Sequence, residues 1–218
     1  MNSAFNVRSA RPEDRAGAYH VCLKTGDHGR DGEPFYREDP EALGRIYVGP
    51  YLDFEPELAL VIEDAAGLCG YAFGAFDSRA FYARYESEWR PALCARFPAP
   101  VGDPALWSRV QQVYHLYHHP DYTTPDPYEA YPSHLHIDLL ERAQGRGFGR
   151  RMLEEIMGRL RQRGSPGAHL GVSALNPRAA GFYRNLGFRE LLRTGSAIDG
   201  CIYLGKSFGR AESRPVAP

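Results

Sequence analysis

Residues 144–152 read Gln-Gly-Arg-Gly-Phe-Gly-Arg-Arg-Met and lie between an apolar run and a helical pattern. The apolar run, 135–140, predicts a strand, and the apolar residues after the stretch, spaced by one, three and four, predict a helix. The first N–H groups of a helix have no partner within it, and the helix dipole adds partial positive charge there. The stretch supplies Gly145, Gly147, Gly149, Arg146, Arg150 and Arg151. Glycine permits close approach of a ligand and arginine adds charge, so the stretch predicts an anion site of the phosphate-binding type.

The glycine spacing argues against two common phosphate-binding motifs. A dinucleotide fold requires Gly-x-Gly-x-x-Gly near the start of a βαβ unit and an acidic residue about 20 positions later. Here the glycines alternate with other residues, so that spacing fails. A Walker loop would continue with Gly-Lys-Ser/Thr, whereas this loop continues with Arg150, Arg151 and Met152.

Two stretches resemble one known superfamily. The run Gln144-x-x-Gly147-x-Gly149 resembles the pyrophosphate loop of the GNAT superfamily of acetyl-coenzyme A-dependent N-acetyltransferases, the alternative being a surface turn rich in glycine and arginine. Residues 176–188 resemble the Asn-x-x-Ala-x-x-Phe-Tyr-x-x-x-Gly-Phe run of the same superfamily. The matching positions are Asn176, Ala179 or Ala180, Phe182, Tyr183, Gly187 and Phe188. The two runs lie some 30 residues apart and together form a specific signal.

The composition is that of an ordinary globular protein. The chain has 218 residues, of which 43% are hydrophobic and 24% charged, and its formal net charge of -1 favours neither nucleic acid nor an anionic membrane. The four cysteines form no Cys-x-x-Cys pair and suggest no metal site. No apolar run of about 18 residues and no signal core occur, so we expect a cytoplasmic protein with reduced thiols.

The patterns along the chain predict the order β α α β β, an insertion, and then β α β α β β. A second helix over 38–48 is predicted to break at Gly49-Pro50-Tyr51, and the insertion, about 77–131, is predicted to hold helices over 81–97 and 105–114. Because helices follow two central strands directly, the sheet is expected to be mixed and partly parallel. The resemblance implies an α/β (α+β) fold of GNAT type, flanked by helices and with the insertion before the coenzyme-binding strand. We expect one acetyltransferase domain over 1–208 and a flexible tail over 209–218.

The resemblance implies that acetyl-coenzyme A is the co-substrate and that no metal takes part. It places the thioester beside the strand 135–140, with a backbone donor near Leu139, and the coenzyme between that strand and the next. The expected coenzyme contacts are Leu139, Leu140, Gln144, Gly145, Arg146, Gly147, Phe148, Gly149, Arg150, Asn176 and Tyr183. Asn176 is also expected to cap the helix that Pro177 opens.

Two residues are candidates for proton transfer. Tyr183 lies where the superfamily usually keeps the tyrosine that protonates the leaving thiolate, the alternative being a core tyrosine. Asp138 lies in the strand before the glycine loop, where burial would raise its pKa in the direction that a general base requires. His134 and His136 share its alternation and are candidates for substrate binding or for structural roles. Asp126 and Glu129, in the insertion, could bind a cationic acceptor or be solvated loop residues.

A narrower resemblance concerns Tyr-Pro-Ser-His-Leu-His-Ile-Asp-Leu-Leu, residues 131–140, and the insertion before it. They resemble bacterial acetyltransferase-like proteins related to the C-terminal domain of animal O-GlcNAcase. The GNAT resemblance as a whole implies an acetyltransferase that acts by direct transfer on an amine of a small molecule or peptide, and the narrower resemblance does not identify the acceptor. The tyrosines of the insertion have apolar rings and polar tips, so we expect the insertion to form part of the acceptor site. The alternative is an inactive acetyl-coenzyme A-binding sensor or interaction module. Both a monomer and a homodimer fit the sequence.

Overall fold

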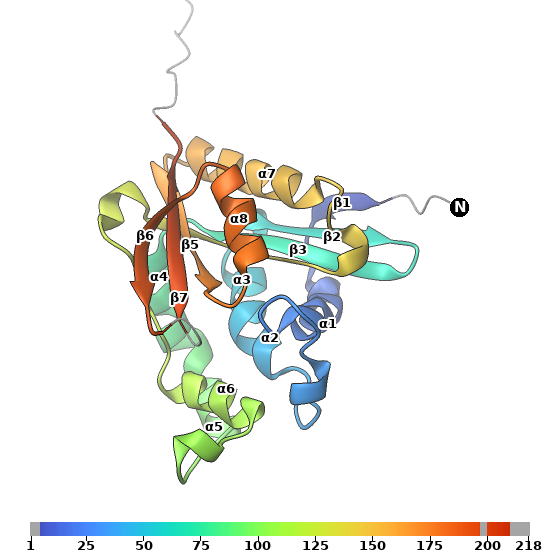
Figure 1. The fold of residues 1–218 in the computed structure, drawn as a ribbon, viewed down its shortest axis with the longest axis vertical. Coiled ribbons are helices and arrows are strands. Elements are labelled where there is room, and N and C mark those ends of the chain that lie inside the picture. Colours follow the sequence, from blue (N-terminus) through green and yellow to red (C-terminus); the bar gives the residue numbers. More distant parts are fainter. Residues whose placement is uncertain (1–4, 197–199, 210–218) are drawn as a thin grey trace, which may run out of the picture.

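The computed structural model describes residues 5–196 and 200–209 (Figure 1). Within them, strands form one sheet in the order β1-β2-β3-β4-β5-β7-β6. The strands are β1 (Asn6–Ser9), β2 (Ala59–Asp64), β3 (Gly67–Ala75), β4 (Ser133–Leu139), β5 (Gly167–Ser173), β6 (Arg189–Thr194) and β7 (Cys201–Ser207). β4 and β5 are parallel, and the other neighbouring pairs are antiparallel, which confirms the expected mixed, partly parallel sheet. The tail expected to be flexible lies, after residue 209, outside the described residues.

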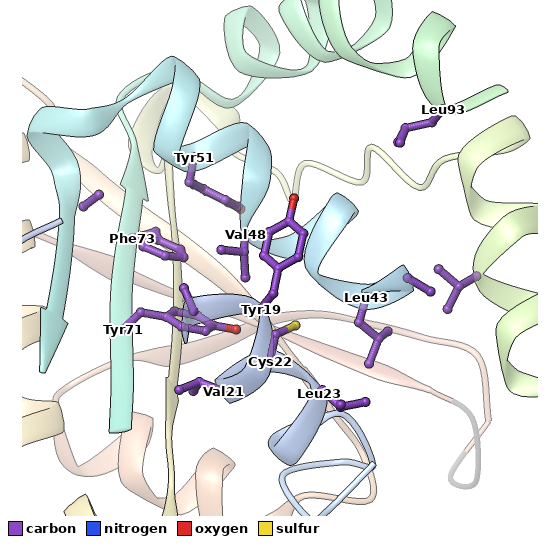
Figure 2. Packing of buried hydrophobic residues seen from close by; sticks show 14 of the residues in the cluster. Tyr19, Val21, Cys22, Leu23, Leu43, Val48, Tyr51, Tyr71, Phe73 and Leu93 are labelled. Carbon is purple, nitrogen blue, oxygen red and sulfur yellow. The ribbon is translucent and has the colours of Figure 1, made fainter. Parts of the chain in front are cut away.

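Helices cover both faces of the sheet (Figure 1). They are α1 (Arg15–Thr25), α2 (Ala42–Tyr47), α3 (Gly49–Phe54), α4 (Ser78–Arg84), α5 (Arg90–Arg96), α6 (Arg109–His118), α7 (Phe148–Gln162) and α8 (Pro177–Asn185). Alternation along β3 separates two cores: Tyr71 and Phe73 pack with α1–α6, whereas Ala72 packs with α7 and α8. Cys69 also lies in the second core, because the register between β2 and β3 shifts at this residue. Figure 2 shows the first of these cores, with Tyr71 and Phe73 facing the helices.

Helix α7 packs closely on β3 because β3 carries a glycine beneath it. The residues Met152, Leu153, Ile156 and Leu160 are fully buried, as the apolar spacing predicts. A Cβ atom at Gly74 would lie 2.7 Å from Cγ2 of Ile156, so only glycine lets the helix approach so closely.

The insertion shares a core with the first helices. Except for Tyr128, its buried apolar residues belong to the same cluster as those of α1–α3, and they are Phe81, Tyr85, Leu93, Val110, Val113 and Tyr117. Figure 1 shows α5 and α6 extending away from the sheet, whereas α4 lies close to it. Phe81 and Tyr82 also contact the ring of His134 on β4, so the insertion reaches the strand that precedes the glycine loop.

The helices expected over 38–48 and 105–114 both have different bounds in the structure. The helix expected over 38–48 is α2, which ends at Tyr47, before Gly49-Pro50-Tyr51, as predicted. Gly49-Pro50 then opens a further helix, α3, because proline suits the first turn of a helix. The helix expected over 105–114 is instead α6, which begins after Ser108, whose side chain forms a capping box with Gln111. Residues 200–207 match the spacing Gly-x-x-x-x-Gly-Lys-Ser, but 201–207 form β7, and no loop-to-helix junction exists there to bind phosphate.

Candidate active site

The two parallel strands diverge after His134, within β4 and ahead of the glycine loop. β4 pairs with β5 only at Ser133–Ala168 and His134–His169. On its other side β4 stays paired with β3, and the N–H of Leu140 donates to the carbonyl of Cys69 at 2.8 Å. Since hydrogen-bonding direction alternates along an antiparallel strand, the N–H groups of residues 137 and 139 point into the gap. The gap therefore has backbone donors along one wall.

The glycine loop ends this gap at the start of α7. Gly145 and Gly147 have φ angles of 70° and 80°, which side-chain-bearing residues rarely adopt. Gly147 is the residue before the first turn of α7, a helix of 15 residues. A Cβ atom at Gly149 would lie 3.2 Å from Phe182 and 3.3 Å from Leu139, so this glycine lets α8 and β4 approach the helix start. The three glycines thus open the helix N-terminus to an anion.

A cavity of about 510 Å³ joins the loop, the gap and α8. The residues expected from the sequence that line it are Asp138, Leu139, Gln144, Gly145, Gly147, Gly149, Arg150, Asn176 and Tyr183. Asn176 also caps α8, since its Oδ1 accepts from the N–H of Ala179 at 3.0 Å. Leu140 lines an adjoining cavity of about 1000 Å³, which shares Leu139, Gln144 and Asn176 with the first.

Gln144 is held by hydrogen bonds on both sides of its amide. Its Nε2 donates to the carbonyl of Leu139 at 2.6 Å, and its Oε1 accepts from Arg178 at 2.5 Å. Arg178 lines both cavities. The sequence interpretation missed this arginine, although its place two residues after Asn176, in the first turn of α8, was a usable signal.

Asp138 faces the cavity from β4, and a quarter of its side chain, 25%, is accessible. Its Oδ2 accepts a hydrogen bond from the Tyr71 hydroxyl at 2.5 Å. Burial raises the pKa of Asp138 to about 7, although the hydrogen bonds from Tyr71 and Thr25 lower it. His136 lies 3.5 Å from the same oxygen, and burial lowers the pKa of His136 to about 4, so this histidine is neutral at pH 7.

Tyr183 faces the same cavity from α8. Its side chain is buried, and its hydroxyl has no hydrogen-bond partner among residues 5–196 and 200–209. Burial raises the pKa of Tyr183, and the carboxylate of Asp138 raises it further. Tyr183 therefore keeps its proton and can donate a hydrogen bond to a group in the cavity.

Four residues expected at the site have side chains that line neither cavity. Arg146 and Phe148 contact the ring of Phe5, at 5.2 Å and 4.9 Å, and do not line either cavity. Asp126 and Glu129 are exposed, and they precede β4, whereas the cavity lies beyond its other end. Tertiary placement, which spacing does not encode, therefore keeps these four side chains out of both cavities, while the backbone N–H groups of residues 146 and 148 remain in the glycine loop.

His134 is a buried structural residue rather than a substrate contact. Its Nδ1 lies 2.8 Å from the Ser78 hydroxyl, and its Nε2 lies 2.8 Å from the Tyr51 hydroxyl. Burial holds the pKa of His134 well below its usual value. Both ring nitrogens are occupied, which corrects the expectation that His134 binds substrate.

The loop after α1 supplies residues that sequence reasoning missed. Thr25 and Gly29 line both cavities. The Nδ1 of His28 lies 2.8 Å from the hydroxyl of Ser173 on β5, and a Cβ atom at Gly29 would lie 2.5 Å from the amide of Asn176. This loop therefore closes the gap on the face opposite α7.

The raised pKa of Asp138 predicts an unusual dependence of stability on pH. An unfolded aspartate has a pKa of about 3.9, so between about pH 4 and pH 7 unfolding releases a proton and stability falls as pH rises. Asp138→Asn removes the buried charge, and we expect it to stabilise the protein at pH 8 by on the order of 1–3 kcal/mol but to change little at pH 5. Thermal unfolding at the two pH values measures this.

Asp14→Asn is the matched control. Asp14 is buried, and its hydrogen bonds with Arg8 lower its pKa, so its removal should destabilise the protein at pH 8. Equal unfolding temperatures of wild type and Asp138→Asn at pH 8 would contradict the raised pKa.

Residues 5–196 and 200–209 contain neither a cluster suited to a metal ion nor a helix suited to a membrane. No group of three or more His, Cys, Asp or Glu residues there could hold a metal ion. No helix of that part of the chain has the length and hydropathy to cross a membrane.

Comparisons with known proteins agree with this geometry. The sequence profile of the Acetyltransferase (GNAT) family matches residues 104–188. The sequence of SsHAT, a protein of known crystal structure, is 38% identical to this chain. The two structures superpose with a TM-score of 0.84, and the match covers 94% of this chain and 98% of that one. The structure of yncA from Salmonella typhimurium, which holds its cofactor acetyl-CoA, has a TM-score of 0.54 at 13% identity and covers 98% and 99% of the two chains. The chain belongs to the GNAT acetyltransferase family.

A longer relative is also similar to this chain. Protein O-GlcNAcase of Rattus norvegicus is 27% identical over 207 residues, which is 94% of this chain. The chain spans 22% of the length of that relative. The similarity therefore concerns one region of O-GlcNAcase, as the narrower sequence resemblance predicts.

Proposed function

We propose that the protein transfers the acetyl group of acetyl-coenzyme A directly to an amine of a small molecule or peptide. One observation carries the proposal: a carboxylate with a pKa of about 7 and a protonated tyrosine face one cavity that continues to an anion site at a helix N-terminus. A base, an acid and a phosphate site are the groups that acetyl transfer from a coenzyme requires. The acetyl-CoA held by a protein of similar fold supports this assignment.

Three groups of the site would bind the pyrophosphate, the thioester oxygen and the proton of the amine. The amides of the loop Gly145–Gly149 and the first turn of α7 would hold the pyrophosphate, with Arg150 and Arg178 adding charge. The N–H of residue 139 would donate to the thioester oxygen as negative charge develops on it. Asp138 would accept the proton that the attacking amine loses as the C–N bond forms.

Tyr183 would stabilise the thiolate that leaves as the C–S bond breaks. A free thiol has a pKa of about 8.5, below that of a tyrosine, so complete proton transfer from Tyr183 is uphill. Burial raises the pKa of Tyr183, which makes complete transfer less favourable still. Its hydroxyl therefore acts by donating a hydrogen bond to the thiolate, and solvent supplies the proton.

We expect Tyr183→Phe to lower turnover by at least about tenfold while acetyl-coenzyme A binds within a few-fold of wild type. The substitution removes only the hydroxyl, so the packing of Tyr183 against Phe188 should survive. Tyr128→Phe is the control, because its hydroxyl bonds Asp77 in the insertion and lies outside the cavity. Equal turnover by Tyr183→Phe and wild type, with chemistry rate-limiting, would leave Tyr183 as a core residue.

Release of free coenzyme A thiol, measured across panels of amines and peptides, tests the proposed function. An acetyltransferase releases thiol only when a suitable amine is present. The alternative, an acetyl-coenzyme A-binding module without turnover, predicts binding by calorimetry and no amine-dependent release. The same panels would identify the acceptor.

The formal net charge of -1 favours an acceptor that is neither nucleic acid nor membrane. We also propose that the protein acts in the cytoplasm with its cysteines reduced. Both a monomer and a homodimer are compatible with the site, which one chain builds.

A further inference from the structure

Tyr71 lies at the centre of the sheet, directly opposite the candidate base. It is fully buried on β3, and the antiparallel register pairs it with Asp138 on β4. Opposed residues of an antiparallel pair have Cβ atoms about 4.5–5.5 Å apart and point to the same face. The fold therefore brings the phenol of Tyr71 against the carboxylate of Asp138 without the help of a loop.

The Tyr71 hydroxyl forms hydrogen bonds with two residues of β4, Asp138 and His136. Its hydroxyl donates to Oδ2 of Asp138 at 2.5 Å and lies 3.0 Å from Nε2 of His136. A phenol has one proton, and this proton is on the bond to Asp138, so His136 must donate from Nε2 to the Tyr71 oxygen. The histidine is thereby fixed in the Nε2–H tautomer, and one oxygen of Asp138 is held in place.

Packing prevents Tyr71 from turning away. Its ring stacks on Phe73 with centroids 4.5 Å apart and planes 4° apart. Figure 2 shows its hydroxyl directed toward Cys22 of α1, while Phe73 and Tyr51 lie along the same face of the sheet. The rigid surroundings leave Tyr71 one position for its hydroxyl.

We propose that Tyr71 is the positioning residue of this site: it binds one oxygen of Asp138 and so directs the other oxygen into the cavity. The proposal rests on the proposed function, in which Asp138 accepts the proton of the amine. The titratable groups that face Asp138 are Tyr71, His136, Cys22 of α1 and Tyr183 of α8. None of them is cationic at neutral pH, so Tyr71 is the main group that favours the charged carboxylate.

We expect Tyr71→Phe to move the acidic limb of the pH–rate profile to higher pH by about one unit. The reason is that the lost hydrogen bond favoured the ionised form of Asp138. At pH 7 kcat/KM should fall about fivefold, because the ionised fraction of Asp138 falls from about a half to about a tenth. The dissociation constant of acetyl-coenzyme A should not change, because Tyr71 does not line the cavity.

Tyr51→Phe is the matched control. Tyr51 is also buried, also stacks on Phe73, and bonds a histidine, but that histidine is His134. The control should lower stability, by about 1–3 kcal/mol for a histidine left without its partner, and leave the pH–rate profile in place. A merely structural role for Tyr71 would make the two variants behave alike, which would overturn the proposal.

A carbon-13 NMR titration of aspartate-labelled protein reports Asp138 without turnover. The carboxyl resonance of Asp138 is identified as the one that is absent from Asp138→Asn. The pH at the midpoint of its titration should rise in Tyr71→Phe but not in Tyr51→Phe. An unchanged midpoint in a folded Tyr71→Phe variant would overturn the proposal even if the enzyme is active. A raised midpoint in a protein that releases no thiol with any amine would support the hold of Tyr71 on Asp138 and reject the proposed function instead.

Discussion

Asp138→Asn is expected to lower the turnover of acetyl transfer by about 10²–10⁴-fold, the usual contribution of a general base. Asparagine keeps the size of the side chain and the acceptor for Tyr71 but cannot take a proton. In the wild type, kcat/KM should rise with pH through about 7 as Asp138 ionises, and this limb should vanish in the variant. Steady-state rates of thiol release between pH 5 and pH 9 measure both effects.

Two controls make this result specific. Acetyl-coenzyme A should bind Asp138→Asn with nearly the wild-type affinity by calorimetry, since Asp138 is expected to meet the amine. Asp126→Asn changes an exposed aspartate outside the cavity and should leave the rate unaltered. Retention of the wild-type rate and pH limb by Asp138→Asn would assign the proton to water or to another residue.

Gly147→Asp is expected to abolish detectable binding of acetyl-coenzyme A, with an affinity loss of at least about 100-fold. Gly147 has a φ of 80°, so any side chain there strains the backbone at the start of α7. The carboxylate would also occupy the position of the pyrophosphate and repel it at the helix N-terminus. Isothermal titration calorimetry measures the affinity directly.

Gly164→Asp is the matched control for Gly147→Asp. Gly164 has a φ of 96°, lies just past the other end of α7, and has open space around a Cβ atom, as Gly147 does. The control carries the same backbone strain and the same charge, far from the phosphate site. Calorimetry that shows equal affinities for the two variants would refute the role of the loop.

Local signals in the sequence were sufficient for most of the fold. The apolar spacing of α7, the cap at Asn176 and the positive φ at Gly187 were all predictable, because each depends on residues within one turn of one another. The start of α6 was missed because Ser108 and Gln111 form a capping box that the sequence interpretation overlooked. The placement of β7 between β5 and β6 was not predictable, because it depends on pairing between distant segments.

The residues of the candidate site likewise differ in whether a local sequence signal marks them. The glycine loop, Asp138 and Tyr183 were found because they stand in or beside a recognisable run of residues. Tyr71 and Thr25 were not found, because they reach Asp138 only through strand pairing and helix packing. Conversely, Glu129 is close to β4 in sequence, but it is exposed and does not line the cavity, which no spacing rule could show.

The short pairing of β4 with β5 has a mechanical consequence. The sheet consists of two halves, β1–β4 and β5–β7–β6, whose backbones join at only two residue pairs. A ligand bound between β4 and β5 would contact both halves. Its contacts would hold the halves together where backbone hydrogen bonds between the two strands are missing. Its binding free energy would then add to the resistance of the sheet to opening, by about 2.7 kcal/mol at a ligand concentration 100 times Kd. A coenzyme bound there, as proposed, would thus make the rigidity of the whole sheet depend on the supply of that coenzyme.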